Sequence, residues 1–403
     1  MINRRVFLAS TIAAGALARR AFSSTQPRIV VIGAGAFGGW TALHLRQQGA
    51  DVTLLDAWGP GNSRASSGGE TRVIRAIYGA DRVYVEMVKR SYELWEALGD
   101  PSLYVETGAL WMHRGDDAYV RSALPILQDL GFIVDKFAVA EAAKRYPQID
   151  FKGVKSVYLE RRAGALSARR ACGVVRDAFV KAGGTYRTAA VKPGSLKSIE
   201  LQDGSKLEAD VFVFACGPWL GKLFPDVIGD RVRPSRQEVY YFGTPRGSDR
   251  YRAGNLPIWI DFGERILYGL PDMSARGFKF ADDTRGEPID PTTAERKPTE
   301  AGIAQARRFL GERFPELAKA PLIAAEVCQY ENSPDGNLIM DRHPSANNVW
   351  LLGGGSGHGF KLSPAVGEMA SAAILAGKDV PKTFRLERLQ NLEKRKTQFE
   401  SKS

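Results

Sequence analysis

The sequence IVVIGAGAFGGWTALHLRQQGADVTLLD, residues 29–56, decides the fold of this chain. Its first four residues are apolar and predict a buried strand, which runs into a glycine-rich turn and a helical pattern ending at Gly49. A second apolar run ends at Asp56. Strand, tight turn, helix and second strand in this order predict a unit that binds a dinucleotide, with its phosphates at the helix N-terminus.

The glycines of the turn and the acid after the second strand have separate predicted roles. Gly33 makes the sharp turn, Gly35 lets the backbone approach a pyrophosphate, and Gly38 lets the helix pack closely on the strand. Asp56 stands about twenty residues past the glycines, where a carboxylate accepts hydrogen bonds from a ribose 2′-hydroxyl. A glycine-rich helix start also occurs in βαβ units where it serves packing alone, and the pattern leaves the identity of the dinucleotide open.

Composition narrows the class of protein. The chain has 403 residues, of which 44% are hydrophobic, enough to bury a sizeable core and to form two domains. The net charge of +11 is scattered, with no long Lys/Arg run outside the first twenty residues, so we expect surface charge and no nucleic-acid partner. Cys172, Cys216 and Cys328 have no metal-like spacing, and an odd count excludes a complete disulfide framework.

Residues 1–24 are typical of an export signal. Arg4 and Arg5 precede a short Ala-rich apolar run and a small-residue site near Ala18, which together favour a twin-arginine signal and a periplasmic protein. The alternatives are a basic tail or a membrane anchor. The apolar run is too short to span a bilayer, so we expect no stable membrane insertion. Export by this route suits a protein that folds around its cofactor before crossing.

The remaining pattern predicts two domains that alternate along the chain. Residues 231–280 are rich in β-branched and aromatic residues with frequent turns, which indicates an antiparallel sheet inserted into the dinucleotide-binding domain. Elsewhere we expect helices at 82–97, 116–132, 168–182, 300–314 and 364–376, strands at 104–113, 211–215, 324–330, 337–341 and 349–352, and a hairpin at 199–207.

Two further segments have the residue types of a binding site. Arg72 and Arg75 are three residues apart, so on a helix or turn they share one face and can meet an acidic group. A solvated basic face is the alternative, and the spacing alone favours it. The glycine-rich segment from Gly353 to Lys361 lies between a predicted strand and a predicted helix, where backbone N–H groups can face an anion or an electron-rich ring.

Taken together, these segments resemble the FAD-dependent amine oxidases of the D-amino-acid oxidase superfamily, in the branch of monomeric sarcosine oxidase and N-methyltryptophan oxidase. The resemblance covers nearly the whole chain after residue 24. It rests on the order and spacing of Gly33–Asp56, Gly69–Arg75 with Tyr78, Ala215–Trp219, Tyr268–Pro271, Gly277–Lys279, Val327–Tyr330, Pro334–Asp335, Ile339–Asp341 and Gly355–Lys361. Any one of these segments alone would be weak evidence.

The resemblance implies a role for each matching residue. Cys328 matches the cysteine that carries a covalent flavin, Lys279 the lysine beside flavin N5 that promotes reaction with O2, and Arg75 with Lys361 the pair that binds a substrate carboxylate. Arg72 matches the arginine over the flavin. The expected reaction-site residues are Lys279, Arg72, Arg75, His358, Lys361, Tyr268 and Tyr330. The expected FAD-binding residues are Gly33, Ala34, Gly35, Ala36, Phe37, Gly38, Asp56, Thr71, Arg72, Val73, Val191, Cys216, Gly217, Trp219, Cys328, Gly357, His358, Gly359, Phe360 and Lys361.

The chain also departs from the family pattern. Ser67 and Gly68 stand where sarcosine oxidase has histidines, Gln329 replaces a methionine beside the flavin cysteine, and Asp283 replaces a histidine four residues after the lysine. We expect these changes around the flavin and the substrate cavity. They put sarcosine itself in doubt and favour a larger N-substituted amino acid.

The implied fold class is α/β (α+β), a Rossmann-like FAD-binding domain with an inserted antiparallel-sheet substrate domain. We expect the FAD-binding domain at 25–80, 166–230 and 321–385, the substrate domain at 81–165 and 231–320, and a charged tail, read as a solvated terminal helix, at 386–403.

The implied reaction is oxidation of the C–N bond of a secondary amine or amino acid, with O2 reduced to H2O2, in a monomer. The alternatives are a flavin dehydrogenase that uses a quinone or carrier, a non-catalytic flavoprotein and, more weakly, an NAD(P) dehydrogenase.

Overall fold

Strand β1 (Arg28–Ile32) lies inside a six-stranded sheet with the order β18-β19-β12-β1-β2-β9. It pairs in parallel with β2 (Asp51–Asp56) and with β12 (Val211–Phe214). Because parallel neighbours need a crossover, the chain leaves β1 through the glycine turn and returns to β2 through α1 (Ala36–Gln47). The predicted strand, turn, helix and second strand are all present.

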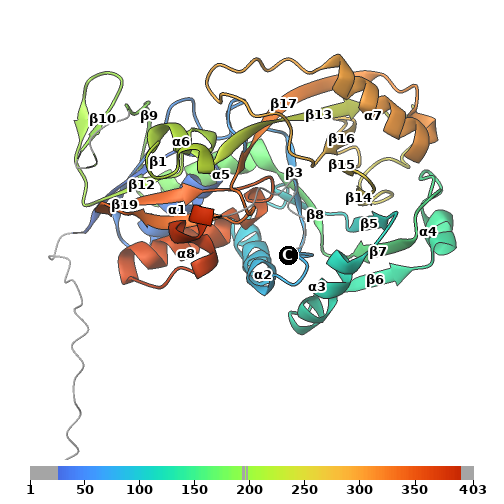
Figure 1. The fold of residues 1–403 in the computed structure, drawn as a ribbon, viewed down its shortest axis with the longest axis horizontal. Helices are drawn as coiled ribbons and strands as arrows, with labels where there is room; N and C mark the ends of the chain where they lie inside the picture. Colours follow the sequence, from blue (N-terminus) through green and yellow to red (C-terminus); the bar gives the residue numbers. More distant parts are fainter. Residues whose placement is uncertain (1–25, 193–195, 197, 392–403) are drawn as a thin grey trace, which may run out of the picture.

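The apolar residues of β1 alternate between the two faces of this sheet. Ile29 and Val31 belong to the core that contains α1 and α8, whereas Val30 and Ile32 pack with Phe214 on the other face. Both faces are covered, which explains the continuous apolar run in the sequence. Figure 1 shows α1 and α8 on one side of the sheet, with α2 beside α8.

The computed structural model of the protein describes residues 26–391 except 193–195 and 197. The predicted export signal at 1–24 lies outside the described residues. Of the tail predicted at 386–403, only Leu386–Asn391 is described, and it forms a 3₁₀ helix, η6.

A second, eight-stranded sheet has the order β17-β13-β16-β15-β14-β5-β7-β6, and most of its neighbouring strands are antiparallel. Helix α7 (Glu300–Arg313) packs on it through an aromatic cluster in which the ring of Trp259 stacks on Phe278 and Phe309. In Figure 1 this sheet and α7 lie to the right of the dinucleotide-binding sheet. The predicted mixed fold with an antiparallel second sheet is confirmed.

One strand differs from the sequence prediction. Strand β17 (Leu322–Asn332) was expected in the dinucleotide-binding domain, but it pairs antiparallel along β13 (Arg233–Phe242) in the second sheet. The cause is the length of the strand: only its last residues reach the first domain, where Ser356 N–H donates to Glu331 O. Strand β17 therefore connects the two parts of the molecule.

Most predicted elements are present within a few residues of their expected bounds. The remaining helices are α2 (Arg82–Ala97), α3 (Ala118–Asp129), α4 (Val139–Arg145), α5 (Ala168–Lys181), α6 (Leu220–Leu223) and α8 (Ser363–Ala376). The remaining strands are β3 (Thr71–Ile74), β4 (Tyr104–Glu106), β5 (Ala109–His113), β6 (Val134–Phe137), β7 (Ser156–Glu160), β8 (Gly164–Ser167), β9 (Thr185–Thr188), β10 (Ile199–Glu200), β11 (Lys206–Leu207), β14 (Ile258–Phe262), β15 (Ile266–Leu270), β16 (Phe278–Asp282), β18 (Ile339–His343) and β19 (Ala346–Gly353). The segment 104–113 forms two strands in different sheets, and β3, α4, β6, β7, β8, β9 and α6 have no predicted counterpart. Among the described helices, none combines the length and apolar character needed to cross a membrane.

Candidate active site

A cavity of about 390 Å³ lies where the carboxyl ends of β1, β2 and β12 meet the end of β17. Fourteen of the predicted site residues line it: Gly33, Gly35, Ala36, Phe37, Asp56, Arg72, Val191, Cys216, Gly217, Trp219, Tyr330, Gly357, Gly359 and Phe360. The crevice beyond the strand ends is the usual ligand site of an open α/β sheet.

The glycine turn has the geometry that a dinucleotide needs. Gly33 has φ of 102°, and a Cβ there would lie 2.3 Å from Ala215 O. A Cβ on Gly38 would lie 1.8 Å from Gly33 O, so only glycine permits this close packing. At Gly35, by contrast, a Cβ would meet only Ser67 Oγ, at 3.5 Å. Packing therefore demands Gly33 and Gly38, whereas Gly35 leaves space in the cavity.

The N-terminus of α1 opens into the same cavity. Its N-cap is Gly35, which has no side-chain capping bond, and no acidic residue lies in the first turn. Ser67 Oγ accepts the N–H of Ala36 at 3.2 Å. The positive end of the helix dipole is thus free of negative side chains, which fits the pyrophosphate of a dinucleotide.

Asp56 holds the turn and the following loop together. Its Oδ2 accepts the N–H of Ala34 at 2.8 Å, and its Oδ1 accepts the N–H groups of Trp58 and Gly59. Burial raises the pKa of this carboxyl despite these three bonds. A ribose hydroxyl would use the remaining lone pairs, so the predicted role is compatible with a second, structural role of Asp56.

Arg72 and Arg75 do not share a face, contrary to the expectation from their spacing. Arg72 lies in a strand, β3, which ends at Ile74, and Arg75 follows the strand end, so the two residues are not on one helix or turn. The Arg72 guanidinium contacts Cys328 Sγ at 3.3 Å. Arg75, by contrast, donates to Ile77 O, and its guanidinium lies 4.6 Å from the centre of the Tyr78 ring. One strand end therefore supplies two different parts of the site.

The Arg72 side contains the residues expected at the reactive part of the flavin. Lys279 Nζ donates to Thr71 O at 2.9 Å, and Lys279 is only 2% exposed. Burial and the neighbouring Arg72 lower the pKa of Lys279 to about 7. Cys328 is a partly exposed free cysteine beside Arg72. The structure brings Lys279, Arg72 and Cys328 together from β16, β3 and β17.

The Arg75 side contains a second buried cation. Lys361 Nζ lies 5.3 Å from the centre of the Tyr78 ring and donates to His358 O at 3.0 Å. Arg75 and Lys361 are 3% and 4% exposed, so the two side chains converge on one buried aromatic ring. Burial and Arg75 lower the pKa of Lys361 well below its usual value. A bound anion would offset this cost, because it adds negative charge to that of Asp283 and Glu160, which act on both side chains.

His358 is fixed as a neutral imidazole. Its Nε2 lies 2.8 Å from Gly336 O, which can only accept, so Nε2 carries the proton. Its Nδ1 then accepts the hydroxyl proton of Tyr78 at 3.0 Å. Burial and Lys361 hold the pKa of His358 well below its usual value. His358 thereby sets the orientation of the tyrosine that both cations contact.

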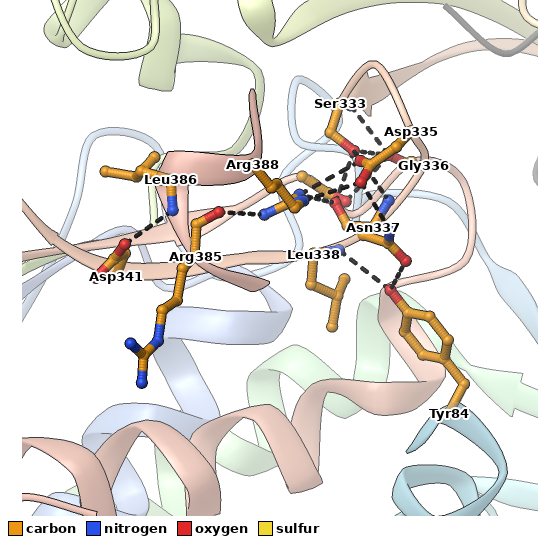
Figure 2. A network of polar contacts seen from close by, with 12 residues as sticks. Tyr84, Ser333, Asp335, Gly336, Asn337, Leu338, Asp341, Arg385, Leu386 and Arg388 are labelled. Carbon is orange, nitrogen blue, oxygen red and sulfur yellow. Dashed lines mark hydrogen bonds and ion pairs between the residues drawn. The ribbon is translucent and has the colours of Figure 1, made fainter. Parts of the chain in front are cut away.

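The loop that carries Gly336 is tied down by a polar network (Figure 2). Arg388 Nε donates to Asp335 Oδ2 at 2.9 Å, and Asn337 Nδ2 donates to the same oxygen at 2.7 Å. Tyr84 from α2 donates its hydroxyl proton to Asn337 Oδ1 at 3.0 Å. The segment around η6 is therefore connected through this loop to His358.

Tyr330, Tyr268 and Asp283 form a third group. Tyr330 OH donates to Asp283 Oδ1 at 3.1 Å, and a side-chain hydrogen bond joins Tyr330 to Tyr268. Burial raises the pKa of Tyr268 to about 12, so its hydroxyl keeps its proton at neutral pH. Asp283 is only 6% exposed and affects the pKa values of both Arg75 and Lys361. Asp283, which replaces a histidine of the family pattern, thus lies on the Arg75 side of the site.

The other departures lie along the cofactor cavity. Gln329 is fully buried, lines the cavity and donates to Arg64 O at 2.6 Å. Ser67 contacts the start of α1, so its effect is expected on the cofactor rather than on the substrate end. Among the predicted residues, Ala34, Gly38, Thr71, Val73, Lys279, Cys328, His358, Lys361, Arg75 and Tyr268 do not line the cavity itself.

Sequence reasoning missed several cavity residues. These are Trp58, Asn62, Ala65, Ser66, Ala189, Ala190, Gln202, Lys222, Leu223, Thr292 and Glu331. Trp58 could have been found from the sequence, because it is a large aromatic residue two positions after the predicted ribose-binding acid. In the structure it is 45% exposed and lies against Trp219. Gln202, Lys222 and Thr292 come from separate surface segments, and no local pattern marks them.

Fold and cavity together define an α/β protein that holds a dinucleotide at the ends of its parallel strands. Residues 28–373 match the family model described as FAD dependent oxidoreductase (DAO). The chain therefore belongs to this family of flavoenzymes.

Monomeric sarcosine oxidase from Bacillus sp. (strain B-0618) is 31% identical over 371 residues, covering 88% of this chain and 94% of that protein. N-methyl-L-tryptophan oxidase from Salmonella dublin is 26% identical, covering 85% of this chain and 93% of that protein. Among solved structures, L-proline dehydrogenase from P. horikoshii superposes with a TM-score of 0.78 at 22% identity, covering 92% of this chain and 99% of that one. This last likeness supports the fold.

Proposed function

We propose that this enzyme oxidises the C–N bond of an N-substituted amino acid, with FAD as the redox group and O2 as the final electron acceptor. The observation that carries the proposal is the convergence of Arg75 and Lys361 on the buried ring of Tyr78. Two buried cations at one place suit a carboxylate, which a guanidinium and an ammonium bind with charge-assisted hydrogen bonds. Relatives named sarcosine oxidase and N-methyl-L-tryptophan oxidase support an N-substituted amino acid.

FAD, when bound, accepts the hydride of the carbon next to the nitrogen, and water hydrolyses the resulting imine. The residues of the chain bind and orient the substrate. Arg75 and Lys361 hold its carboxylate, and the arriving negative charge favours the protonated form of Lys361. The amine must be neutral to release hydride, so turnover should rise with pH until the bound amine has lost its proton.

Lys279 is proposed to serve the oxidative half of the cycle. A protonated lysine stabilises the negative charge that develops on O2 as it takes up electrons. Because the Lys279 pKa is lowered to about 7, its charged fraction falls as the pH rises above neutrality. The reductive and oxidative half-reactions are therefore expected to have opposite pH dependences.

We further propose that FAD is held covalently by a thioether to Cys328. The thiol is free, partly exposed and beside the Arg72 guanidinium. Wild-type protein denatured in acid should keep its yellow colour in the pellet, whereas Cys328→Ala should release FAD into the supernatant. Cys216→Ala is the control, since Cys216 lines the same cavity but its thiol is turned toward Ile32 O. Release of FAD from denatured wild type contradicts the thioether.

The reaction class is tested by anaerobic bleaching of the flavin with a panel of N-methyl, cyclic and sugar-conjugated amino acids. We expect bleaching by at least one amino acid with a secondary amine and slower bleaching by its carboxyl ester. Reoxidation by O2 with formation of H2O2 supports an oxidase. Reoxidation by a quinone dye alone supports a dehydrogenase, and no bleaching by any member supports a non-catalytic flavoprotein.

We also propose that the protein is a monomer and that it is exported to the periplasm. The support for export is the Arg4-Arg5 pair and the apolar run that follows it. Fractionation of cells that express the full chain tests it: the wild type should reach the periplasm, and the double change Arg4→Lys, Arg5→Lys should leave the protein in the cytosol. Size-exclusion chromatography with light scattering tests the monomer.

A further inference from the structure

Glu331 is a buried carboxyl group in the cofactor cavity for which neither the sequence pattern nor the reaction above has a role. It lies near the end of β17, is 5% exposed, and lines the cavity together with Gly33, Gly35 and Gly355. The backbone amides of Gly354 and Gly355 face its carboxyl group. This is the glycine-rich turn whose N–H groups were expected to face an anion, and the nearest anion proves to be a side chain of the protein itself.

One oxygen of this carboxyl is not satisfied by the protein. Glu331 Oε1 is fully buried and has no hydrogen-bond partner among the described residues. A Cβ on Gly353 would lie 2.3 Å from Oε1, so the group is held tightly under the turn. A buried carboxyl oxygen without a partner favours the protonated form, because the charged form loses more solvation on burial.

Within the part of the chain that the structure describes, no cation forms an ion pair with Glu331. The other titratable side chains that line the cavity are Asp56, Arg72, Cys216, Lys222 and Tyr330, and none of them forms a hydrogen bond or ion pair with it. Cys216 is near enough that burial, Asp56 and Glu331 together raise the pKa of its thiol. Burial raises the pKa of Glu331 to about 7. At neutral pH this carboxyl is therefore protonated in about half of the molecules that lack cofactor.

We propose that Glu331 is a neutral carboxylic acid when FAD is bound: it is held under the glycine turn at the wall of the cofactor cavity and is coupled to FAD through its charge, without direct contact. The negatively charged pyrophosphate enters the same cavity and removes water from it, and both effects favour the protonated acid over the carboxylate. FAD binding is therefore coupled to the uptake of one proton at Glu331. The proposal rests on the family's cofactor and does not depend on which amine is oxidised.

The test measures FAD affinity as a function of pH in the full chain carrying Cys328→Ala, so that binding is reversible. With a free-protein pKa of about 7, the dissociation constant should be about 30-fold larger at pH 8.5 than at pH 6. In this background Glu331→Gln, a permanently neutral group of the same shape, should bind about as tightly at pH 6 and lose most of the pH dependence. Glu331→Ala, which also carries no charge at this position, should lose the pH dependence as Glu331→Gln does.

The pKa of Lys279 is also about 7, so Lys279 can add its own pH dependence to FAD binding. The test therefore compares the pH dependence of FAD affinity in Glu331→Gln with that in its parent, since both contain Lys279. Glu208→Gln, at an exposed position outside the cavity lining, should keep the parental pH dependence. Calorimetry in two buffers of different ionisation enthalpy should show uptake of about one proton at pH 8 in the parent and clearly less in Glu331→Gln. An unchanged pH dependence in Glu331→Gln or in Glu331→Ala overturns the proposal. Thermal unfolding of each apoprotein verifies that it is folded.

Discussion

The two ends of the site are built by different means. At the anchor end, the turn from Gly33 to Gly38 offers backbone amides, a helix dipole and space, with Asp56 as its main charged group. At the reactive end, buried Lys279, Arg75 and Lys361 are held by hydrogen bonds and aromatic rings, with the pKa of both lysines lowered by burial. The anchor end thus depends on glycines, which have no side chain. The reactive end depends on the charges of a few buried side chains. Changes at the first should affect folding and loading, and changes at the second should affect chemistry.

The largest expected effect is that of Gly38→Ala at the anchor. Its Cβ would lie 1.8 Å from a backbone oxygen that cannot move freely, so we expect a loss of about 3 kcal/mol in the free energy of unfolding and protein without FAD. The matched change Gly35→Ala should keep the parental stability and bind FAD roughly tenfold more weakly, since its Cβ enters the cavity. Denaturant unfolding and flavin absorbance measure both. Parental stability of Gly38→Ala would show that the turn has another conformation.

Lys279→Met should act at the reactive end alone. We expect reoxidation by O2 to slow by about 100- to 1,000-fold, as is typical when a preorganised charge is removed, while reduction by substrate changes far less. In the parent, the rate of reoxidation should fall as the pH rises through about 7, because Lys279 loses its proton there. The variant should lack this pH dependence. Stopped-flow spectroscopy measures both half-reactions, and the exposed Lys206→Met is the control.

Arg75→Lys should weaken binding of the carboxylate while leaving FAD in place. A lysine cannot present two parallel donors, so we expect the dissociation constant of a carboxylate substrate to rise about 10- to 100-fold. The corresponding ester should lose less than about threefold. Anaerobic titration of flavin bleaching gives both constants. Equal losses for acid and ester would mean that Arg75 supports the fold of the site and does not contact the carboxylate.

The smallest effect is expected from Arg388→Ala, which removes the ion pair to Asp335 shown in Figure 2. Because both side chains are only 11–12% exposed, we expect a loss of about 2 kcal/mol in unfolding free energy and a decrease of about threefold in kcat/KM through the loop that carries Gly336. Arg385→Ala is the control, since its partner Asp379 is fully exposed, and it should cost less than about 1 kcal/mol. Chemical denaturation separates the two variants.

The sequence predicted the anchor well because its determinants are local. Glycines, apolar runs and Asp56 follow one another within one βαβ unit, and each requirement is met by neighbours in the chain. The reactive end is assembled from β3, β16, β17 and the turn after β19, so spacing alone could not bring Lys279 next to Arg72. Resemblance to a family supplied those residues.

Two expectations were wrong because the spacing of residues along the chain does not show which strands pair in the fold. Arg72 and Arg75 were placed on one face because a helix or turn was assumed, whereas pairing with β8 puts Arg72 in a strand that ends before Arg75. The segment 324–330 was placed in the first domain because its last residues reach the cofactor cavity. In the structure, the whole segment pairs with β13 in the second sheet. Glu331 had no signal at all, because nothing in its neighbours shows that the side chain is buried under a glycine turn.

Strand β3 has a consequence for changing the specificity of this enzyme. Arg72 lies in β3 beside Cys328, whereas Arg75 follows the strand end and lies beside Tyr78, so neighbouring residues contribute to two different parts of the candidate site. Natural or directed variation at Arg75, Tyr78 and Asp283 can therefore alter the accepted substrate while the pairing of β3 with β8 keeps Arg72 beside Cys328. A single short strand lets the two halves of the site evolve separately.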